Sequence, residues 1–209
     1  MASMGLDHVI YGTLDLDATI DEIAQRAGVR PALGGSHTGR GTRNALLGTG
    51  GATYVEVLAP DPAQPAEVRA KIGPRVPSTT RITTWAAMCD DLRGTVARAQ
   101  EHGLDLGAVE AMSRARPDGD PLHWRLTRGR LVGGGLIPFL IDWGDTDHPS
   151  RTAPQGCALR SFRAEHPDPG SIRQLLAILG LEDVLTVEQG PAARLFLTLA
   201  TPLGEVTLS

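Results

Sequence analysis

Several residue types are scarce in this sequence, and each shortage excludes a class of protein. There are only two cysteines among 209 residues and no CxxC pair, which disfavours a disulfide framework and a cysteine-based metal cluster. No basic run exceeds a few residues and the net charge is −4, so we expect no nucleic-acid partner. No stretch approaches the roughly 18 apolar residues that a membrane helix requires, so we expect no membrane partner.

The rest of the composition is that of a soluble globular protein. Hydrophobic residues make up 41% and charged residues 21%, and the length suits one large domain or two small ones. The N-terminus has no basic segment followed by an apolar run, so we expect no secretory signal. We expect Cys89 and Cys157 to be buried thiols in a reducing compartment, which predicts a cytoplasmic location.

A strand followed by a capped helix recurs three times, at residues 5–28, 81–103 and 158–180. In each copy an aspartate stands where its carboxylate can accept from the first helical turn, and a glycine ends the helix. These N-cap residues are Asp15, Asp91 and Asp168. Aligning them places one residue of each preceding strand at an equivalent position: His8, Thr84 and Ser161. We therefore predict a repeated unit and compare what each copy carries there.

Further strands follow each helix. In the first copy, residues 31–43 are expected to be a glycine-rich connection, and residues 44–48 and 52–60 a hairpin. Residues 61–80 are predicted to be a proline-rich linker with one short helix near 67–72, and residues 104–143 to hold two or three strands that close with 138–143. Residues 145–156 form a second linker, and three more strands follow the third helix. Strands outnumber helices in a βαβββ order, which excludes a doubly wound fold.

Several segments together resemble the vicinal oxygen chelate superfamily, and within it the glyoxalase-like domain proteins. They are LDHVIYGTLDLD, GRGTRNALLG, YVEVLAPDP, MSRARPDG, HWRL, PFLIDWGDTDHP and EHPDP. The resemblance implies an α+β fold in which repeated βαβββ modules form a curved, cup-shaped mixed sheet. We expect residues 5–144 to form the cup from modules 5–60 and 81–144, and residues 157–209 to form a third βαβββ-like module.

The resemblance also implies where a metal would bind, because the first and last strands of each module supply the ligands in that superfamily. His8 and Glu56 match these two positions in the first module, and Glu56 is also the candidate catalytic residue. The second module offers Thr84 and Asp142, and the third offers Ser161 and Thr207, which departs from a full ligand set. An imidazole and a carboxylate suit Zn²⁺, Mn²⁺, Fe²⁺ or Ni²⁺. The alternative is a hydrogen-bonded His–Glu pair in a cup without metal.

Other residues are candidates for contact with a small-molecule ligand. The loop GGSHTGRGTRNALLG supplies His37, Arg40, Thr42 and Asn44, with solvated arginines as the alternative. The loop is not of the GxxxxGK[ST] type, so we expect no nucleotide cofactor. Ser113, Arg114 and Asp118 either contact the ligand or form a plain turn. Trp124 and Asp142 complete the candidate set, although tryptophans in strands are more often part of the core.

Two classes of function remain open at this stage. The first is a divalent-metal-dependent lyase, isomerase or dioxygenase, in which the metal acts as a Lewis acid toward the substrate. The second is a metal-free protein that binds or sequesters a small organic molecule, as bleomycin-resistance proteins do. A fold resemblance cannot choose between them. The assembly is open too, because two modules in one chain suit a monomer whereas pairing of the third units would give a homodimer.

Overall fold

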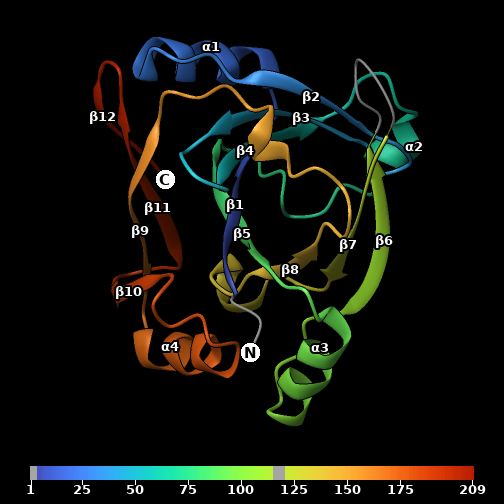
Figure 1. The fold of residues 1–209 in the computed structure, drawn as a ribbon, viewed down its shortest axis with the longest axis vertical. Helices are drawn as coiled ribbons and strands as arrows, with labels where there is room; N and C mark the ends of the chain where they lie inside the picture. Colours follow the sequence, from blue (N-terminus) through green and yellow to red (C-terminus); the bar gives the residue numbers. More distant parts are fainter. Residues whose placement is uncertain (1–3, 115–120) are drawn as a thin grey trace.

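The structure is a computed structural model that describes residues 4–114 and 121–209 (Figure 1). The first module contains β1 (Gly5–Gly12), α1 (Leu16–Ala27), β2 (Ala32–His37), β3 (Thr42–Gly48) and β4 (Tyr54–Pro60), and is followed by α2 (Ala66–Arg69). The second contains β5 (Arg81–Met88), α3 (Leu92–Glu101), β6 (Ala108–Arg114), β7 (Leu122–Arg128) and β8 (Phe139–Asp142). The third contains β9 (Ala158–His166), α4 (Pro169–Ile178), β10 (Thr186–Gln189), β11 (Arg194–Thr201) and β12 (Gly204–Leu208). Short 3-10 turns lie at Val132–Gly135 and Pro149–Arg151.

The three strand–helix repeats are confirmed, together with their N-caps. The carboxylate of Asp15 accepts from the backbone N–H of Ala18 at 3.0 Å. The equivalent bonds run from Gly94 to Asp91 at 2.9 Å and from Ser171 to Asp168 at 3.1 Å. Each cap satisfies one N–H that the first turn of an isolated helix leaves unpaired, which is why the sequence alone located these helices.

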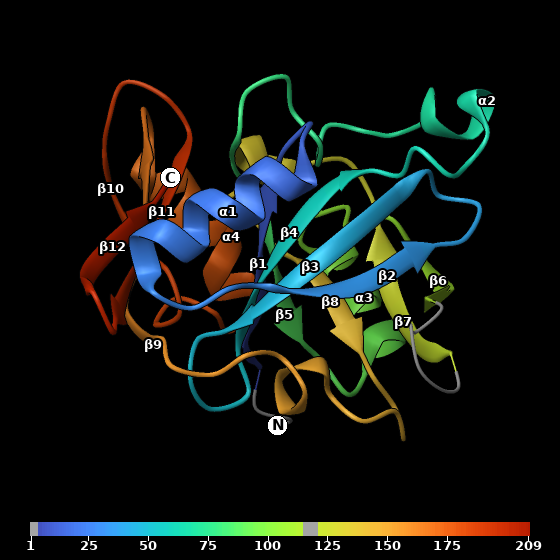
Figure 2. The same ribbon diagram turned by 90° about the horizontal axis from the view of Figure 1, so that it is seen from above.

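The first two modules form one mixed sheet with the strand order β2-β3-β4-β1-β5-β8-β7-β6. Within each module the first strand runs parallel to the last, as β1 does to β4 and β5 does to β8. The modules meet where β1 and β5 pair in antiparallel fashion at the centre of the sheet. This arrangement confirms an α+β fold with a curved, cup-shaped mixed sheet built from two βαβββ modules (Figure 2).

The sheet curls until its two edge strands, β2 and β6, lie close to each other. Two polar contacts join the two halves of the sheet here. Arg40 Nη2 donates to Glu110 Oε2 at 2.9 Å, and Arg114 Nη1 donates to Asn44 Oδ1 at 2.8 Å. The curl therefore gives the sheet a concave inner face that is partly closed on the side away from β1 and β5.

Strand β2 corrects the expectation of an irregular connection over residues 31–43. It pairs with β3 in antiparallel fashion, with a register shift between Leu33 and Gly35. Glycines lower the strand propensity of this segment. A Cβ atom on Gly34 would lie only 2.1 Å from Arg114 Nη1, so the glycine leaves room for the arginine where it crosses β2. The strand is thus specified by a distant contact that the local sequence does not reveal.

The third unit keeps the βαβββ element order but pairs its strands differently. Its four strands form a separate sheet with the order β10-β9-β11-β12, so that β9 has a neighbour on both sides. Pairing of β9 in the manner of β1 and β5 is therefore blocked within this chain. Ser161 and Thr207, expected at ligand positions, are exposed on this sheet, and Thr207 contacts Thr198 at 3.0 Å. The strand pairing of this unit thus differs from that of the two modules that form the cup.

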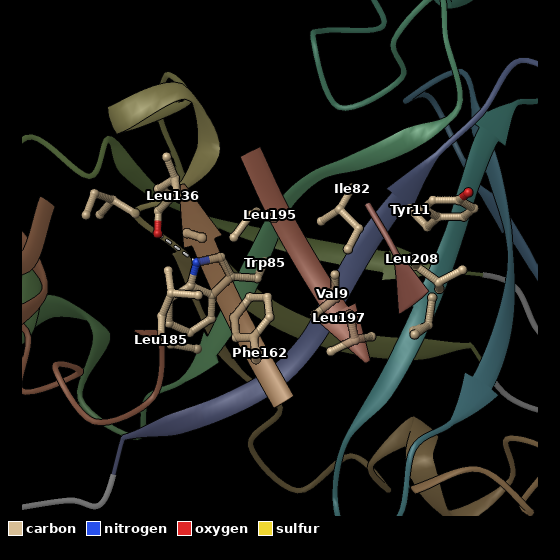
Figure 3. Packing of buried hydrophobic residues seen from close by; sticks show 14 of the residues in the cluster. Val9, Tyr11, Ile82, Trp85, Leu136, Phe162, Leu185, Leu195, Leu197 and Leu208 are labelled. Carbon is tan, nitrogen blue, oxygen red and sulfur yellow. Dashed lines mark hydrogen bonds between the residues drawn. The ribbon is translucent and has the colours of Figure 1, made fainter. Parts of the chain in front are cut away.

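The main core lies between the large sheet and the third unit. Val9, Val55 and Trp85 are buried on the face of the large sheet opposite to His8 and Glu56, as alternation along a strand requires. The Trp85 ring meets Phe162 of β9 edge-on at 5.4 Å, and its Nε1 donates to the carbonyl of Leu136 at 2.8 Å (Figure 3). Helix α1 adds Leu16, Ile20 and Ile23 to the same cluster. The third unit therefore covers the convex face of the large sheet and leaves the concave face for a site.

Two further expectations concern single features of the chain. Cys89 and Cys157 are both buried free thiols, as predicted from their isolation in the sequence. Within the described part of the chain, every helix is too short or too polar to cross a membrane.

Candidate functional site

The concave face of the large sheet encloses a cavity of about 290 Å³. Its wall is polar on the side of the first module, where His8, His37, Asn44 and Glu56 lie. The wall of the second module is mainly apolar and includes Met112, Trp124, Leu126, Phe139 and Ile141. The linker between the modules covers part of the opening with residues 71–76. A concave site with a few polar groups on one side and an apolar wall on the other is typical of small-molecule binding.

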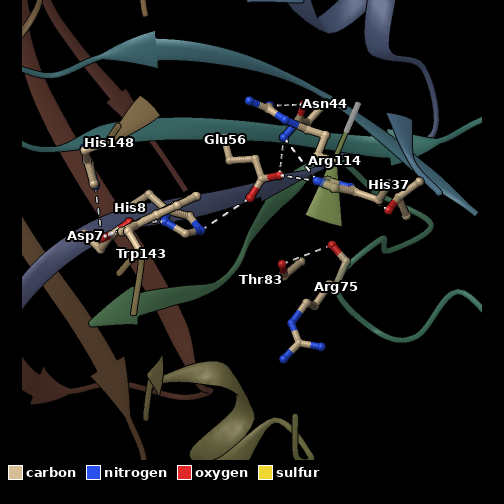
Figure 4. A network of polar contacts seen from close by, with 11 residues as sticks. Asp7, His8, His37, Asn44, Glu56, Arg75, Thr83, Arg114, Trp143 and His148 are labelled. Carbon is tan, nitrogen blue, oxygen red and sulfur yellow. Dashed lines mark hydrogen bonds and ion pairs between the residues drawn. The ribbon is translucent and has the colours of Figure 1, made fainter. Parts of the chain in front are cut away.

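The His8 side chain is held from behind by Asp7. Imidazole Nδ1 lies 2.5 Å from Asp7 Oδ1, and the Asp7 carboxylate is fully buried (Figure 4). The other oxygen of Asp7 accepts from Trp143 Nε1 at 3.0 Å and contacts His148 Nε2 at 3.1 Å. Burial would raise the pKa of Asp7, but hydrogen bonds from His148 and His8 outweigh it and lower that pKa to about 2. Asp7 is therefore ionised and fixes the orientation of the His8 ring.

The opposite edge of the His8 ring faces Glu56 on the neighbouring strand. Nε2 of His8 lies 3.4 Å from Glu56 Oε2, and Asn44 Nδ2 donates to Oε1 at 2.5 Å. His37 Nε2 lies 3.7 Å from the same Oε1 and its Nδ1 is 3.0 Å from Thr42 Oγ1. Burial would raise the pKa of Glu56, but the contacts with His8 dominate and lower it to about 2. Glu56 is thus a carboxylate in spite of its burial.

These contacts fix the protonation states of the two histidines. Burial alone would lower the pKa of His8, but the hydrogen bonds to Asp7 and Glu56 raise it to about 9. His8 is therefore an imidazolium at neutral pH, placed between two carboxylates. The pKa of His37 is lowered, first by burial and also by Arg114 and His8, so His37 is neutral. One charged and one neutral imidazole consequently face the cavity beside the same carboxylate.

Aromatic rings hold the polar group in place. The Tyr54 ring stacks on His8 at a centroid distance of 4.7 Å, and Phe139 meets the same imidazole edge-on at 5.6 Å. Burial raises the pKa of the Tyr54 hydroxyl well above its usual value. Trp124 lies beside His37 at 6.1 Å and beside Trp143 at 5.3 Å. The imidazoles are therefore packed on several sides, which restricts their motion in the cavity wall.

Most of the candidate residues predicted from the sequence line this one cavity. They are His8, His37, Arg40, Thr42, Asn44, Glu56, Arg114 and Trp124. Their roles in binding, catalysis or metal coordination stay predictions. Asp142 is not among the lining residues and instead accepts hydrogen bonds from Arg125 and from the Gly144 N–H. Asp118 lies outside the described residues.

The strand register also corrects the internal comparison of the modules. His8 faces Tyr54 in the β1–β4 pair and Ile10 faces Glu56, whereas Ala86 faces Phe139 in the β5–β8 pair. Because Ala86 is the counterpart of Ile10, Phe139 and not Asp142 stands at the position of Glu56. The connection before β8 is longer than its counterpart before β4, which displaced the alignment made from the sequence. The second module therefore contributes an apolar wall where the first contributes a carboxylate.

Sequence reasoning missed two residues of the site. Strict alternation along the strand predicts that Asp7 and His8 point to opposite faces, but a register shift between Leu6 and His8 in the β1–β5 pair breaks that alternation. The Asp–His dipeptide itself was a usable signal, because a carboxylate commonly orients an imidazole. Arg75 lies in the linker that was expected only to join the modules, and it too lines the cavity. Nothing in its local sequence marks it.

The donor set does not fit a divalent metal in the arrangement that the structure describes. Across residues 4–114 and 121–209, no three His, Cys, Asp or Glu side chains are placed so that they could hold a metal ion. His8 is protonated at neutral pH, whereas a ligating imidazole must be neutral. Asn44 already donates to one oxygen of Glu56. The metal-ligand roles of His8 and Glu56 stay untested predictions.

The fold and the site together define a protein with paired βαβββ modules around a cup-shaped cavity. The sequence of residues 6–180, which is more than half of the chain, matches the glyoxalase-like domain family. The chain therefore belongs to this family, within the vicinal oxygen chelate superfamily. The resemblance noted in the sequence is confirmed.

Solved structures share the fold at low sequence identity. A hypothetical protein from Staphylococcus aureus is similar with a TM-score of 0.67 and 14% identity, covering 98% of this chain and 84% of that one. Methylmalonyl-CoA epimerase from Mycobacterium tuberculosis is similar with a TM-score of 0.42 and 23% identity, covering 67% of this chain and 88% of that one. No curated protein matches the chain. The likeness to the Staphylococcus aureus protein supports the fold and leaves the chemistry to the site itself.

Proposed function

We propose that the cup binds a small organic molecule and transfers a proton on it, as an isomerase does. The observation that carries this proposal is the buried array Asp7–His8–Glu56 at the cavity wall, with a cationic acid and an anionic base on adjacent strands. Groups whose environments push their pKa values in opposite directions are the usual acid and base of such sites. Here the cation is His8 and the anion is Glu56.

The chemistry follows from the placement of the two groups. Glu56 removes a proton from a carbon next to a carbonyl group, while His8 donates its Nε2 proton to the carbonyl oxygen. The C–H electron pair then forms the enol double bond, and no net charge is created on the substrate. Return of a proton to a carbon and of the O–H proton to His8 completes the isomerisation and restores both side chains.

The coupling between the two side chains supports this assignment. The low pKa of Glu56 depends on the positive charge of His8 beside it. As His8 gives up its proton to the substrate, that stabilisation disappears and the carboxylate becomes a stronger base. Asp7 keeps the imidazole oriented throughout, and the cavity wall of Trp124 and Phe139 limits access of water to the reacting carbon.

A metal-free binding or sequestering protein is the second candidate. It is favoured by the number of contacts that Glu56 already makes in the cup, because His8 and Asn44 both engage its oxygens. A carboxylate held this firmly can serve as a fixed hydrogen-bond acceptor for a ligand. The two candidates differ in one observable: only the enzyme exchanges carbon-bound protons with solvent.

The test is solvent deuterium exchange into a panel of small carbonyl compounds, followed by NMR. We expect the wild-type protein to exchange the α-proton of at least one compound, and Glu56→Gln to lower that rate by about 10²-fold or more, the usual range for a lost general base. Glu67→Gln, on the exposed face of α2, is the matched control and should exchange like the wild type. His8→Gln should also lose exchange.

The outcomes separate the two candidates. Exchange that survives in Glu56→Gln overturns the role of Glu56 as the base. Binding of compounds, seen as a change in tryptophan fluorescence, without exchange of any α-proton favours the sequestering protein. The fluorescence change is expected because Trp124 and Trp143 both line the cavity.

A further inference from the structure

Among the residues that the structure describes, cationic side chains outnumber carboxylates in the lining of the cavity. Its lining includes five cationic side chains, Arg40, Lys71, Arg75, Arg114 and Arg128, and one carboxylate, Glu56. The Glu56 charge is matched by the imidazolium of His8. Glu110, from outside the cavity, compensates Arg40 at 2.9 Å and lies 4.0 Å from Arg128. Lys71 and Arg75 also line this cavity, and their charges favour an anion as the ligand.

Arg75 is the cation of this lining that carries the argument. Among the residues that the structure describes, no carboxylate lies within 4.0 Å of its guanidinium, although the side chain is half-buried. Burial lowers the pKa of Arg75, and the nearby charge of Arg128 lowers it further. A cation removed from water without a partner costs free energy, which an anion supplied by a ligand would offset.

The backbone of Arg75 is held at two points, which fixes where its side chain begins. The Arg75 carbonyl accepts from Thr83 Oγ1 at 3.1 Å, as Figure 4 shows. On its other side the carbonyl packs against Gly12, where a Cβ atom would lie only 2.3 Å away. The linker is therefore attached to both central strands at this point, β1 through Gly12 and β5 through Thr83. Arg75 is thus a fixed part of the cup and not a freely moving surface residue.

The ring of Phe139 connects Arg75 with the acid–base pair. The guanidinium carbon lies 5.1 Å from the centroid of this ring, and the His8 imidazole lies 5.6 Å from it. A ligand whose body packs on Phe139 would therefore reach His8 at one end and Arg75 at the other. The apolar wall of Trp124, Met112 and Leu126 suits an aromatic or branched body of modest size in about 290 Å³.

We propose that Arg75 binds a carboxylate of the ligand and thereby makes the cup selective for small organic acids with an apolar body. Arginine presents a planar pair of N–H donors that matches the two oxygens of a carboxylate. This inference rests on the proposed function, in that it names the class of molecule that enters the same cavity. Arg75 sets specificity and takes no part in the proton transfer.

The test compares the binding of benzoate with that of benzamide, its neutral analogue of nearly the same shape. Tryptophan fluorescence reports binding, with both compounds titrated to tens of millimolar. We expect the wild-type protein to prefer benzoate, and Arg75→Gln to weaken benzoate binding by about tenfold or more while leaving benzamide unchanged. Arg81→Gln, an exposed arginine at the start of β5, is the control that should keep the preference. Arg75→Lys should restore part of the preference for benzoate over benzamide.

Each other outcome contradicts a specific statement. A preference for benzoate that persists in Arg75→Gln overturns the role of Arg75. Equal binding of benzoate and benzamide by the wild type overturns selectivity for acids but leaves the cup as a small-molecule site. If neither compound changes the fluorescence, this inference fails, whereas the proposed function is judged separately by the exchange of α-protons. Because the Arg75 backbone is held through its carbonyl, all three variants are expected to fold, which circular dichroism checks.

Discussion

The His8 imidazole lies between two carboxylates, and this arrangement gives each of the three groups a pKa far from its ordinary value. Burial opposes all three charged forms, so the charges persist only because each has its partner. The trio is therefore mutually dependent. Removal of any one charge leaves another buried without compensation, which makes the pH dependence of stability a direct readout of the site.

Stability should be greatest between about pH 4.5 and 6.5, as far as these groups determine it. The pKa of His8 rises from 6.5 to about 9 on folding, so its contribution is complete below pH 6.5 and is lost as the pH rises through about 9. Asp7 and Glu56 have folded pKa values of about 2 against ordinary values of 3.8 and 4.5, so their contributions are lost as the pH falls toward 2. Urea unfolding over a series of pH values measures this profile.

The variant His8→Gln isolates the alkaline limb of that profile. Glutamine has no ionisable group, so the fall in unfolding free energy between pH 6.5 and 9 should largely disappear in the variant. His102→Gln, at the exposed C-terminus of α3, is the control and should retain the wild-type limb. An equal fall in wild type and His8→Gln would show that His8 is not protonated in the folded protein.

The same charges predict weak affinity for divalent metals. A metal would have to displace the proton of His8 and the Asn44 amide from Glu56. We therefore expect Zn²⁺, Mn²⁺, Fe²⁺ and Ni²⁺ to leave the thermal midpoint unchanged at neutral pH, and elemental analysis to find far less than one metal per chain. A midpoint that rises with a metal in the wild type but not in Glu56→Gln would instead establish the metal site that the family resemblance implies.

At the scale of elements, a helix or strand could be predicted from the sequence when the interactions that specify it lie within one segment of the chain. The strand–helix units were predictable because an N-cap, an apolar stripe and a terminal glycine act within one segment. Strand β2 could not be predicted, because Gly34 leaves room for a contact with Arg114 of β6. The role of Asp7 could not be predicted, because a register shift turned its side chain. The role of Arg75 could not be predicted either, because only tertiary contacts place the linker over the cup. His8 and Glu56 lie on neighbouring strands and were predicted to point to the same face of the sheet. Both line the cavity.

Gly34 gives a test of how the two edge strands meet. A methyl group there would lie 2.1 Å from Arg114 Nη1 and 2.3 Å from Asn44 Oδ1, so Gly34→Ala should separate this hydrogen-bonded pair. We expect a loss of about 1–3 kcal/mol in unfolding free energy, the range for a lost hydrogen bond to a charged group and for overpacking. Gly5→Ala, where the added atom meets nothing within 4 Å, is the control. Equal stability of the two variants in urea would show that Arg114 moves aside without cost.

For the whole molecule, the third unit matters as the cover of the convex face. Within the described residues its sheet pairs no strand with the large sheet. The two are joined by side chains of one shared apolar cluster and by a backbone hydrogen bond from Leu159 to Thr49 at 2.8 Å. A shared core predicts that the chain unfolds in a single transition, although the strands belong to two sheets. The shared core also means that residues outside the cup help to support β5 and β1, and therefore the site.

Phe162→Ala tests this dependence. Phe162 is buried against Trp85 of β5, so its loss should cost about 3–5 kcal/mol and lower the single unfolding transition of the entire chain. Phe196→Ala removes the same side chain from a half-buried position beside Arg163 and should cost much less. Tryptophan fluorescence and far-ultraviolet circular dichroism should report coincident midpoints in both variants. If Phe162→Ala instead produced an early transition seen by circular dichroism alone, the third unit would be an independent domain, and the cup would not need its support.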